Sequence, residues 1–431
     1  MYALAAMHLL IIPSWYPTPI QPTRGTFFRE QAQALSAADF QVGVIAPQRR
    51  SLRWLLKSRR GLPSGMTFND DRGVATYSHT GWSTQPFWPT MHTRLWLRAG
   101  HRLFEHYIQR HGRPDMIHAH SAILGGVLAA EISERHDIPF VLTEHSTSFA
   151  RGLIRPWQKL LVERAFRTAS ARLAVSPALG TLLAEQYPKV VGEWEWVPNM
   201  VDPVFRPSDK HADSTNIHRP FRWLNVALLT EKKGHSDLLL AFAEAFAGNR
   251  EHELRIGGAG PERARLQALA GQLGIADQVR FLSELSREQV VSEMQQCDAF
   301  VLPSHVETFG VVLIEAMACG KPVIATRCGG PECFVNESCG ILVPPRDPTA
   351  LASAMRSCAD DYLRYPALKI SHDCLHRFSG EAVVRQLHEV YDRVLWSQRK
   401  AVDPVAASFQ PGSFEPDALL HDVMHEREQA A

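Results

Sequence analysis

Short hydrophobic runs alternate with amphipathic segments of helical period along most of this chain. A buried strand of a parallel sheet is typically such a run, whereas a helix repeats its apolar residues every three or four positions. In the first half, the pattern predicts strands at Leu9–Ile12, Val42–Ala46, Val74–Tyr77, Met116–His118, Phe140–Thr143, Leu173–Val175 and Trp194–Val197. Helices are predicted between them, for example at Thr26–Leu35, Leu124–Arg135 and Pro156–Ala169. The alternation predicts an α/β fold with parallel sheets.

The same rhythm starts again in the second half of the chain. Strands are predicted at Trp223–Leu228, Glu253–Ile256, Val279–Leu282, Ala299–Leu302, Pro322–Ala325 and Gly340–Val343. Between the halves, a segment rich in proline and polar residues is typical of a linker. We therefore expect two doubly wound, Rossmann-like domains at residues 7–198 and 221–380, joined by a linker at 199–220. Residues 381–399 have the spacing of a terminal helix, and residues 400–431 are predicted to be a loose tail.

Composition narrows the class of protein. The 431 residues are 45% hydrophobic and 21% charged, which excludes intrinsic disorder for most of the chain. Basic and acidic residues nearly cancel, 46 against 45, so no global field attracts nucleic acid. The seven cysteines all follow Gln296 and lack the spacing of a zinc site, which favours reduced thiols in a cytosolic protein.

We expect neither a targeting segment nor a membrane-spanning segment. No window approaches the roughly 20 apolar residues that cross a bilayer. The first strand candidate has no basic segment before it, so a signal peptide is not expected, and Met1 and Met7 are both open as the native start. We expect a cytoplasmic protein that is soluble or lies on a membrane surface.

The stretch from Leu302 to Ile324 carries the strongest chemical signal. A strand ends at Leu302, a loop holds Glu307, and a helix begins near Val311 with Glu315 one turn inside it. Ligands of open parallel sheets bind beyond the carboxyl ends of the strands, and free amides at a helix N-terminus suit phosphate. Both carboxylates can then face one crevice, where each suits the hydroxyls of a sugar or a ribose. The alternative is two solvated glutamates, but Glu315 lies in an apolar run where an unpaired carboxylate is costly.

This block, Ser-x-x-Glu-Thr-Phe-Gly followed by Glu-Ala-Met-Ala-Cys-Gly-Lys-Pro-Val, resembles the signature of the family-4 retaining glycosyltransferases, also grouped as glycosyl transferases group 1. The resemblance extends from about Leu9 to Leu395. It implies the GT-B fold: two Rossmann-like domains facing across a cleft, with a C-terminal helix crossing back. It also implies that Glu307 contacts the donor sugar, that Glu315 holds the nucleotide ribose, and that the amides of Phe309, Gly310 and Val311 bind the donor diphosphate.

Two glycine-rich turns are consistent with a nucleotide crevice. Gly258 and Gly260 follow a strand and precede a helix, which lets a nucleotide approach the backbone, although many Rossmann-like domains have such loops without this role. The turn from Arg327 to Glu332 is either a wall of the same crevice or an ordinary strand-to-helix turn.

One segment departs from the family pattern. The family often has an arginine and then a lysine after the first strand of the second domain, and together they clamp the diphosphate. Here Lys233 matches the lysine, whereas Leu228 stands where the arginine is expected. The missing cation is worth about 1.5–3 kcal/mol unless Lys232 or Arg327 replaces it.

The first domain is expected to hold the acceptor. The resemblance places a glycine loop beneath the donor phosphates, which makes Gly25 and the adjacent Thr26 candidates, and its strand-end histidine matches His145 best. For His120 a structural role is preferred. Trp15 and Tyr16 are either platforms for sugar rings or core aromatics. No metal site is expected, since this fold class handles the diphosphate with cations and helix dipoles.

Residues 49–60 form a basic segment with six cations around Trp54 and three leucines. Such a composition is typical of an amphipathic helix that docks on an anionic membrane carrying a lipid-linked acceptor. A solvated basic helix packed on its own domain is an equal alternative.

The resemblance therefore implies an enzyme of the hexosyltransferase type. It would move a sugar, with retention of configuration, from a nucleotide sugar, UDP- or GDP-linked, to a glycan or lipid-linked glycan, in surface polysaccharide or lipopolysaccharide assembly. No residue is placed as a covalent nucleophile, so a front-face route is expected, with catalysis by positioning and leaving-group stabilisation. The alternative is a catalytically weak binding subunit of a glycan assembly complex. A nicotinamide-dependent oxidoreductase lacks its full glycine motif, and a glycosidase needs no nucleotide crevice.

Overall fold

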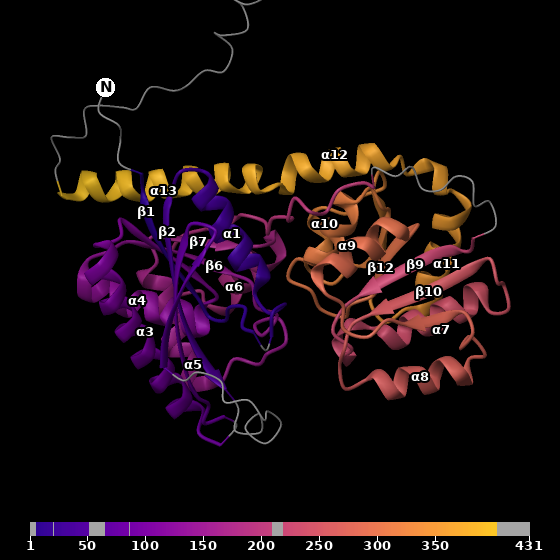
Figure 1. The fold of residues 1–431 in the computed structure, drawn as a ribbon, viewed down its shortest axis with the longest axis horizontal. Coiled ribbons are helices and arrows are strands. Elements are labelled where there is room, and N and C mark those ends of the chain that lie inside the picture. The colour runs from indigo at the N-terminus through magenta and orange to yellow at the C-terminus, as the bar shows by residue number, and fades with distance from the viewer. Residues whose placement is uncertain (1–5, 20, 51–64, 86, 209–218, 403–431) are drawn as a thin grey trace, which may run out of the picture.

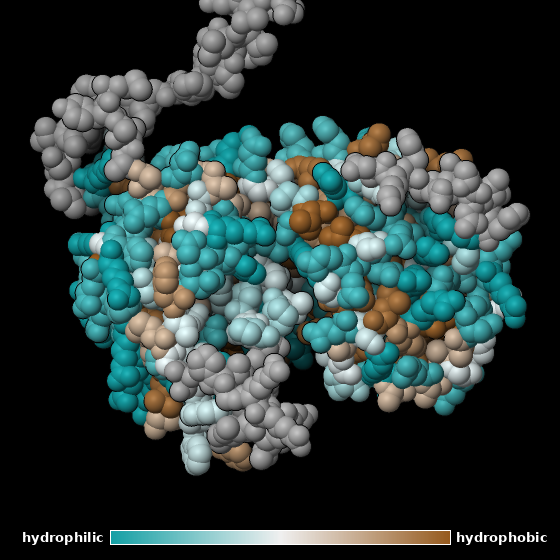
Figure 2. Space-filling model, in the orientation of Figure 1, coloured by the Kyte–Doolittle hydropathy of each residue, from teal (hydrophilic) through white to brown (hydrophobic). Residues whose placement is uncertain are grey.

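The computed structural model describes residues 6–19, 21–50, 65–85, 87–208 and 219–402. The chain forms two α/β domains that lie side by side, each built on one largely parallel sheet (Figure 1). This confirms the predicted fold class. The face shown in Figure 2 is mostly hydrophilic, and it is hollowed between the two domains at the lower edge of the view.

The sheet of the first domain has the order β3-β4-β2-β1-β5-β6-β7-β8 within the described residues. All neighbours are parallel except β3, which pairs antiparallel with β4. Its strands are β1 (His8–Pro13), β2 (Gln41–Arg50), β3 (Gly65–Asp71), β4 (Val74–Trp82), β5 (Met116–His120), β6 (Phe140–Glu144), β7 (Ala171–Ala174) and β8 (Trp194–Trp196). Its helices are α1 (Thr26–Ala37), α3 (Pro89–His111), the short π-helix η1 (Ala122–Gly126), α4 (Val127–His136), α5 (Pro156–Thr168) and α6 (Pro177–Gln186).

The sheet of the second domain has the order β11-β10-β9-β12-β13-β14, and the pairs are parallel throughout the described residues. Its strands are β9 (Phe221–Val226), β10 (His252–Gly257), β11 (Val279–Phe281), β12 (Ala299–Leu302), β13 (Val323–Thr326) and β14 (Gly340–Val343). Its helices are η2 (Glu231–Lys233), α7 (His235–Phe246), α8 (Arg263–Gln272), α9 (Arg287–Gln296), α10 (Val311–Ala318), η3 (Pro331–Cys333), α11 (Pro348–Asp360), η4 (Tyr362–Arg364) and α12 (Ala367–Phe378).

Both sheets reverse their winding direction beside their first strand. In the first domain β1 lies between β2 and β5, and in the second β9 lies between β10 and β12. The loops after β1 and β5, and those after β9 and β12, therefore diverge at the carboxyl edges of the sheets. In open α/β sheets such a switch point is where ligands bind.

The C-terminal helix α13 (Gly380–Val402) leaves the second domain and runs along the first, as predicted (Figure 1). Val383, Leu387 and Tyr391 are fully buried and belong to the apolar cluster that contains Leu9 of β1. The Tyr391 hydroxyl also lies 2.6 Å from Nδ1 of His118 in β5. Packing of its apolar stripe and this buried hydrogen bond fasten the helix to the first domain.

Two features differ from the expected elements. Strand β3 is not predicted by the pattern, because its apolar residues Met66 and Phe68 are 40% and 55% exposed while Asp71 is buried. The strand β9 ends at Val226 rather than at Leu228, so Leu228 lies in the following loop and is 66% exposed.

The basic segment predicted at residues 49–60 lies largely outside the described residues. Its first two residues, Arg49 and Arg50, end strand β2, and the Arg49 guanidinium donates to the main-chain carbonyl of Leu95 in α3. Among the described helices, none combines the length and apolar character needed to cross a bilayer.

Candidate functional site

Residues 303–310 connect β12 to α10 and are called the donor loop after the role expected of them. Gly310 has φ 95°, a left-handed conformation that glycine adopts without steric cost, and it is the N-cap residue directly before helix α10. Phe309 is 1% exposed and packs against the rings of Phe334 and Phe378, with centroids 4.9 and 5.8 Å away. The aromatic anchor holds the loop so that the main-chain amides of Phe309, Gly310 and Val311 lie at the start of the helix.

Glu307 and Lys233 meet at the switch point of the second sheet. Glu307 follows β12 and Lys233 follows β9, and the two side chains form an ion pair while Ser304 Oγ donates to the same carboxylate oxygen at 2.9 Å. The carboxylate is 9% exposed. Two residues that the sequence assigned to the site are thus brought together from segments 74 residues apart.

Glu315 lies one turn inside α10 and is 4% exposed. Its Oε1 accepts a hydrogen bond from the Arg287 guanidinium at 2.6 Å. Burial raises the pKa of Glu315, whereas the charge of Arg287 and its hydrogen bond lower it. An unpaired carboxylate would be costly in this apolar helix, but Glu315 is paired with Arg287. Arg287 is not among the site residues predicted from the sequence.

Three neighbouring histidines lie at the carboxyl edge of the first sheet. His120 Nδ1 and His145 Nε2 are 3.1 Å apart, and the ring of His118 lies 4.2 Å from that of His120. Burial, together with the nearby His118, lowers the pKa of His145 to about 3, and burial lowers the pKa of His120 well below its usual value. Both rings are therefore neutral at physiological pH, each with one N–H and one acceptor nitrogen. Phe27 and Phe28 of α1 pack on His145 at 5.3 and 4.9 Å.

A buried carboxylate supports this edge of the sheet. Glu144 is 0% exposed and accepts hydrogen bonds from the amides of Ala122, His145 and Ser146 at 2.7–2.8 Å. It thereby joins the loop after β5 to the loop after β6. Glu144 is not among the site residues predicted from the sequence, although a glutamate directly after the apolar run Phe140–Thr143 is an available signal.

The two domains touch at the site. Thr308 Oγ1 of the donor loop donates to the main-chain carbonyl of His145 at 2.7 Å, and Lys232 Nζ lies 3.3 Å from Thr147 Oγ1. Burial, and next the charge of Lys233, lowers the pKa of Lys232. The structure therefore holds Lys232, Lys233, Glu307 and His145 around one interdomain boundary.

The glycines assigned to the site have packing reasons of their own. A Cβ on Gly258 would lie 1.9 Å from the carbonyl oxygen of Ala227, and one on Gly260 would lie 2.3 Å from that of Leu229. These two glycines let the loop after β10 pack closely on the loop after β9. Across the sheet, a Cβ on Gly330 would lie 2.4 Å from the amide nitrogen of Phe309, so the second glycine-rich turn packs on the donor loop.

The glycine loop of the first domain ends at Gly25, whose φ is 79° and which precedes Thr26, the first residue of α1. A Cβ at Gly25 would lie 2.9 Å from Trp15 Cδ1, and Trp15 packs on Phe28 with centroids 5.3 Å apart. Trp15 is half-buried, whereas Tyr16 is 6% exposed and belongs to the core. Burial leaves Tyr16 little surface for a sugar ring.

The sequence pattern places Leu228 where a second cation was expected. In the structure Leu228 is 66% exposed and Arg327 is also exposed. The described residues hold no group of three histidine, cysteine or acidic side chains able to ligate a metal ion.

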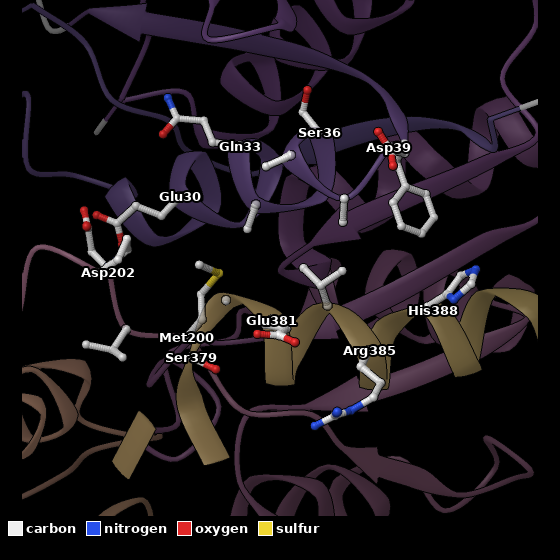
Figure 3. Close-up of a pocket in the computed structure, with 18 of the residues that line it drawn as sticks. Glu30, Gln33, Ser36, Asp39, Met200, Asp202, Ser379, Glu381, Arg385 and His388 are labelled. Carbon is white, nitrogen blue, oxygen red and sulfur yellow. The ribbon is translucent and has the colours of Figure 1, made fainter. Parts of the chain in front are cut away.

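A wide groove of about 1000 Å³ lies elsewhere, between α1, α13 and the linker. Figure 3 shows Glu30 and Asp202 next to one another at one end, and Arg385 and His388 of α13 towards the other. The groove does not include the donor loop or His145 among its lining residues.

The chain matches two family descriptions in succession. Residues 25–205 match Glycosyltransferase Family 4, and residues 208–370 match Glycosyl transferases group 1. Glycogen synthase of Mycobacterium tuberculosis is 28% identical over 272 residues, which is 62% of this chain and 65% of that relative. The putative teichuronic acid biosynthesis glycosyltransferase TuaC of Bacillus subtilis is 26% identical over 90% of this chain and 99% of its own length.

Two solved structures illustrate the similarity in fold. Sucrose-phosphate synthase of Thermosynechococcus elongatus has a TM-score of 0.74 and 21% identity, covering 90% of this chain and all of that one. Anabaena HepE in complex with UDP-glucose has a TM-score of 0.67 and 20% identity, with the same coverage. At these identities the likeness concerns the fold, which is the two-domain arrangement described above.

Proposed function

The chain belongs to the group 1 glycosyltransferases, and we propose that it transfers a hexosyl group from a nucleotide sugar to a glycan or lipid-linked glycan acceptor. The observation that carries this proposal is the Lys233–Glu307 pair at the switch point of the second sheet, directly across the domain boundary from His145. A cation, a carboxylate and a neutral imidazole there suit an activated, anionic sugar donor.

In the proposed site the two lysines carry the positive charge that the donor diphosphate needs. The diphosphate would be surrounded by three groups: the ammonium groups of Lys232 and Lys233, the main-chain amides of Phe309–Val311, and the glycine loop at Gly25. Glu307 would contact the hydroxyls of the donor sugar, and His145 would lie near its anomeric carbon. Glu315 would accept hydrogen bonds from the ribose. Gly258 and Gly260 would form the wall beside the nucleotide.

We infer a UDP- or GDP-linked donor and no resident metal or other cofactor. The similarity in fold to HepE, solved with UDP-glucose, favours a uridine nucleotide, and the lysines and helix amides supply the charge that a metal supplies elsewhere. Addition of EDTA should therefore leave the rate unchanged, whereas a fall in rate restored by Mg²⁺ would assign the site a metal.

The mechanism we propose retains the anomeric configuration. His145 and His120 are neutral, and Glu307 is the only carboxylate in the donor loop. We therefore propose a front-face route. In this route the departing diphosphate accepts the proton of the acceptor hydroxyl. Lys233 would stabilise the charge that develops on the leaving diphosphate. Closure of the domains, held by Thr308 and Lys232, would exclude water.

The acceptor class rests on a relative. TuaC is named for teichuronic acid biosynthesis, and a cell-surface glycan assembled at the cytoplasmic face of the membrane is the corresponding proposal for this chain. The basic composition of residues 49–60 is compatible with peripheral contact to anionic lipid.

The direct test is turnover of UDP-glucose, UDP-galactose and GDP-mannose with a lipid-linked glycan extract as acceptor. Release of nucleoside diphosphate that depends on the acceptor, and is lost in Glu307→Gln, is the expected result. Proton NMR of the fresh product reports the anomer: the donor's configuration is expected, and the opposite one would overturn retention. Nucleotide binding without turnover of any donor would favour a binding subunit instead.

A further inference from the structure

One arginine joins three carboxylates that come from three different parts of the chain. Arg287, the first residue of α9, places NH1 2.6 Å from Glu315 Oε1 and NH2 2.7 Å from Glu30 Oε1. The same NH2 lies 3.3 Å from Asp202 Oδ2. Glu315 belongs to the second domain, Glu30 to helix α1 of the first, and Asp202 to the linker. The guanidinium therefore connects both domains and the segment between them.

The cluster is only partly open to water. The side chains of Glu315 and Glu30 are 5% and 12% exposed, and that of Arg287 is 30% exposed with its guanidinium 4.5 Å above the ring of Phe205. The Glu30 and Asp202 carboxylates lie together at the end of the groove in Figure 3. Ion pairs at such depth are screened little by salt, so their geometry matters.

We propose that Arg287 is a positioning residue of the donor site: it orients Glu315 towards the ribose of the nucleotide donor and couples that orientation to the first domain through Glu30. The inference rests on the proposed function for the role of Glu315, and extends it to a residue outside the signature block. Arg287 itself does not touch the donor in this assignment; it acts through the carboxylate that does.

The choice of arginine has a geometric reason. Its planar fork presents two nitrogens in fixed directions, so one side chain can bond carboxylates on opposite sides of a domain boundary at once. NH1 engages only Oε1 of Glu315, and the second oxygen of that carboxylate is the one assigned to the ribose hydroxyls. A lysine has a single ammonium and cannot hold both carboxylates in that fixed arrangement.

The positive charge of Arg287 affects the pKa of Glu315, and this effect makes the proposed role of Arg287 measurable. Three carboxylates face one guanidinium, and burial raises the pKa of Glu30 to about 7 and raises the pKa of Glu315, with Arg287 opposing both. Without the opposing charge of Arg287 the pKa of Glu315 moves further upward, so at a given pH a larger share of its carboxyl group is protonated and accepts hydrogen bonds less strongly. The charged or titratable groups facing Glu315 and Glu30 are Arg287 of α9, Arg29 of α1, Asp202 of the linker and Cys319 at the end of α10.

The test is calorimetric titration of the full chain with whichever of UDP and GDP binds the wild type more tightly, between pH 6.5 and 9. At pH 7, Arg287→Gln is expected to bind about tenfold to a hundredfold more weakly than the wild type. The ratio of the two dissociation constants should fall as the pH rises, because a larger share of Glu315 in the variant is then ionised. Using the ratio cancels the titration of the ligand phosphate, which is common to both proteins.

Three further variants separate positioning from general loss of structure. Arg287→Lys keeps a cation beside Glu315, so its binding should follow the pH course of the wild type more closely than Arg287→Gln. The double variant Arg287→Gln/Glu315→Gln should lose the recovery at high pH. Arg255→Gln is the matched control, since Arg255 forms two 2.7 Å bonds to Glu293 inside the second domain and touches none of the cluster; it should bind as the wild type does.

The outcomes are distinct for the inference and for the function on which it rests. Weak binding by Arg287→Gln that is the same at every pH, or binding equal to the wild type, overturns the inference while leaving the proposed function in place. If the wild type binds neither UDP nor GDP, the proposed function fails and the inference fails with it. Weak binding that recovers with pH only while Glu315 is present supports both.

Discussion

Thr308 Oγ1 donates a hydrogen bond to the main-chain carbonyl of His145, 2.7 Å away and 163 residues earlier in the chain. The donor loop of the second domain is thus fixed directly to the strand end of the first. Because the acceptor is a main-chain atom, the contact positions the His145 loop without using the imidazole. This bond would have to break for the two domains to separate at the site.

The first prediction concerns this bond. Thr308→Val keeps the shape of the side chain but removes the donor, so the closed arrangement should lose about 1 kcal/mol and transfer should slow about fivefold. Steady-state rates measure the effect, and Thr308→Ser, which keeps the hydroxyl, should return most of the activity. Equal rates for Thr308→Val and the wild type would show that the contact does not limit closure.

A second prediction adds a charge. Leu228→Arg places a cation beside the lysines at a position already 66% exposed, so the fold should not change. One additional charge-assisted hydrogen bond to a diphosphate is worth about 1.5–3 kcal/mol, and the KM for the donor should fall about tenfold or more. Leu363→Arg, at a leucine 95% exposed on the same domain, is the control and should leave the KM unchanged. No difference between the two variants would place Leu228 away from the diphosphate.

A third prediction tests the central ion pair. Glu307→Gln should lower kcat by about 100-fold, because it removes a charge-assisted contact to the donor sugar and leaves the Lys233 ammonium without its partner. Lys233→Met should cause a loss of similar size. The double variant should be little worse than either single variant, since the two residues act as a unit. Losses that multiply would indicate independent roles.

The fourth prediction is a pH dependence of stability. Burial lowers the pKa of His118 and His145 to about 3 in the folded protein, against 6.5 in the unfolded chain. The unfolded state therefore binds more protons below pH 6.5, and the free energy of unfolding should fall from that pH downward by up to about 1.4 kcal/mol per pH unit for each histidine. Urea titrations between pH 7.5 and 5 measure the slope.

Two substitutions test the origin of this pH dependence, one at a buried histidine and one at an exposed control histidine. His118→Asn should make the slope shallower, although it also removes the bond to Tyr391 and lowers stability at every pH. His372→Gln, at a side chain 80% exposed, should leave the slope as it is. A slope that persists unchanged in His118→Asn would show that other groups cause it.

The sequence predicts most of the fold because buried parallel strands leave a direct signal. Strands Val323–Thr326 and Gly340–Val343 consist almost entirely of apolar residues, and the bounds of each lie within one residue of the predicted strand. Strand β3 leaves no such signal, because it is an edge strand whose apolar side chains face solvent. The position of β3 is set by its antiparallel pairing with β4. The local pattern of apolar and polar residues does not predict this tertiary interaction.

Some residues of the candidate site are likewise predicted from the sequence, and others are not. Glu307 and Glu315 are predicted because they lie in one short signature, and Lys233 because it follows a strand in a recognised context. Arg287 and Glu144 are not, since each acquires its role only when segments far apart in the chain meet: Arg287 bonds Glu30 across 257 residues. The purpose of Gly258 and Gly260 is also visible only in three dimensions, where each faces a backbone carbonyl.

The most direct measurement of the central claim is the melting temperature with UDP, GDP, ADP, TDP and NAD, for the wild type and for Glu315→Ala. A ligand at about 100 times its dissociation constant stabilises the folded state by about 2.7 kcal/mol, which is a readable shift. Donor binding at this site predicts that one nucleoside diphosphate raises the wild-type midpoint, that NAD does not, and that the rise is absent in Glu315→Ala. A midpoint unmoved by every nucleoside diphosphate would contradict it.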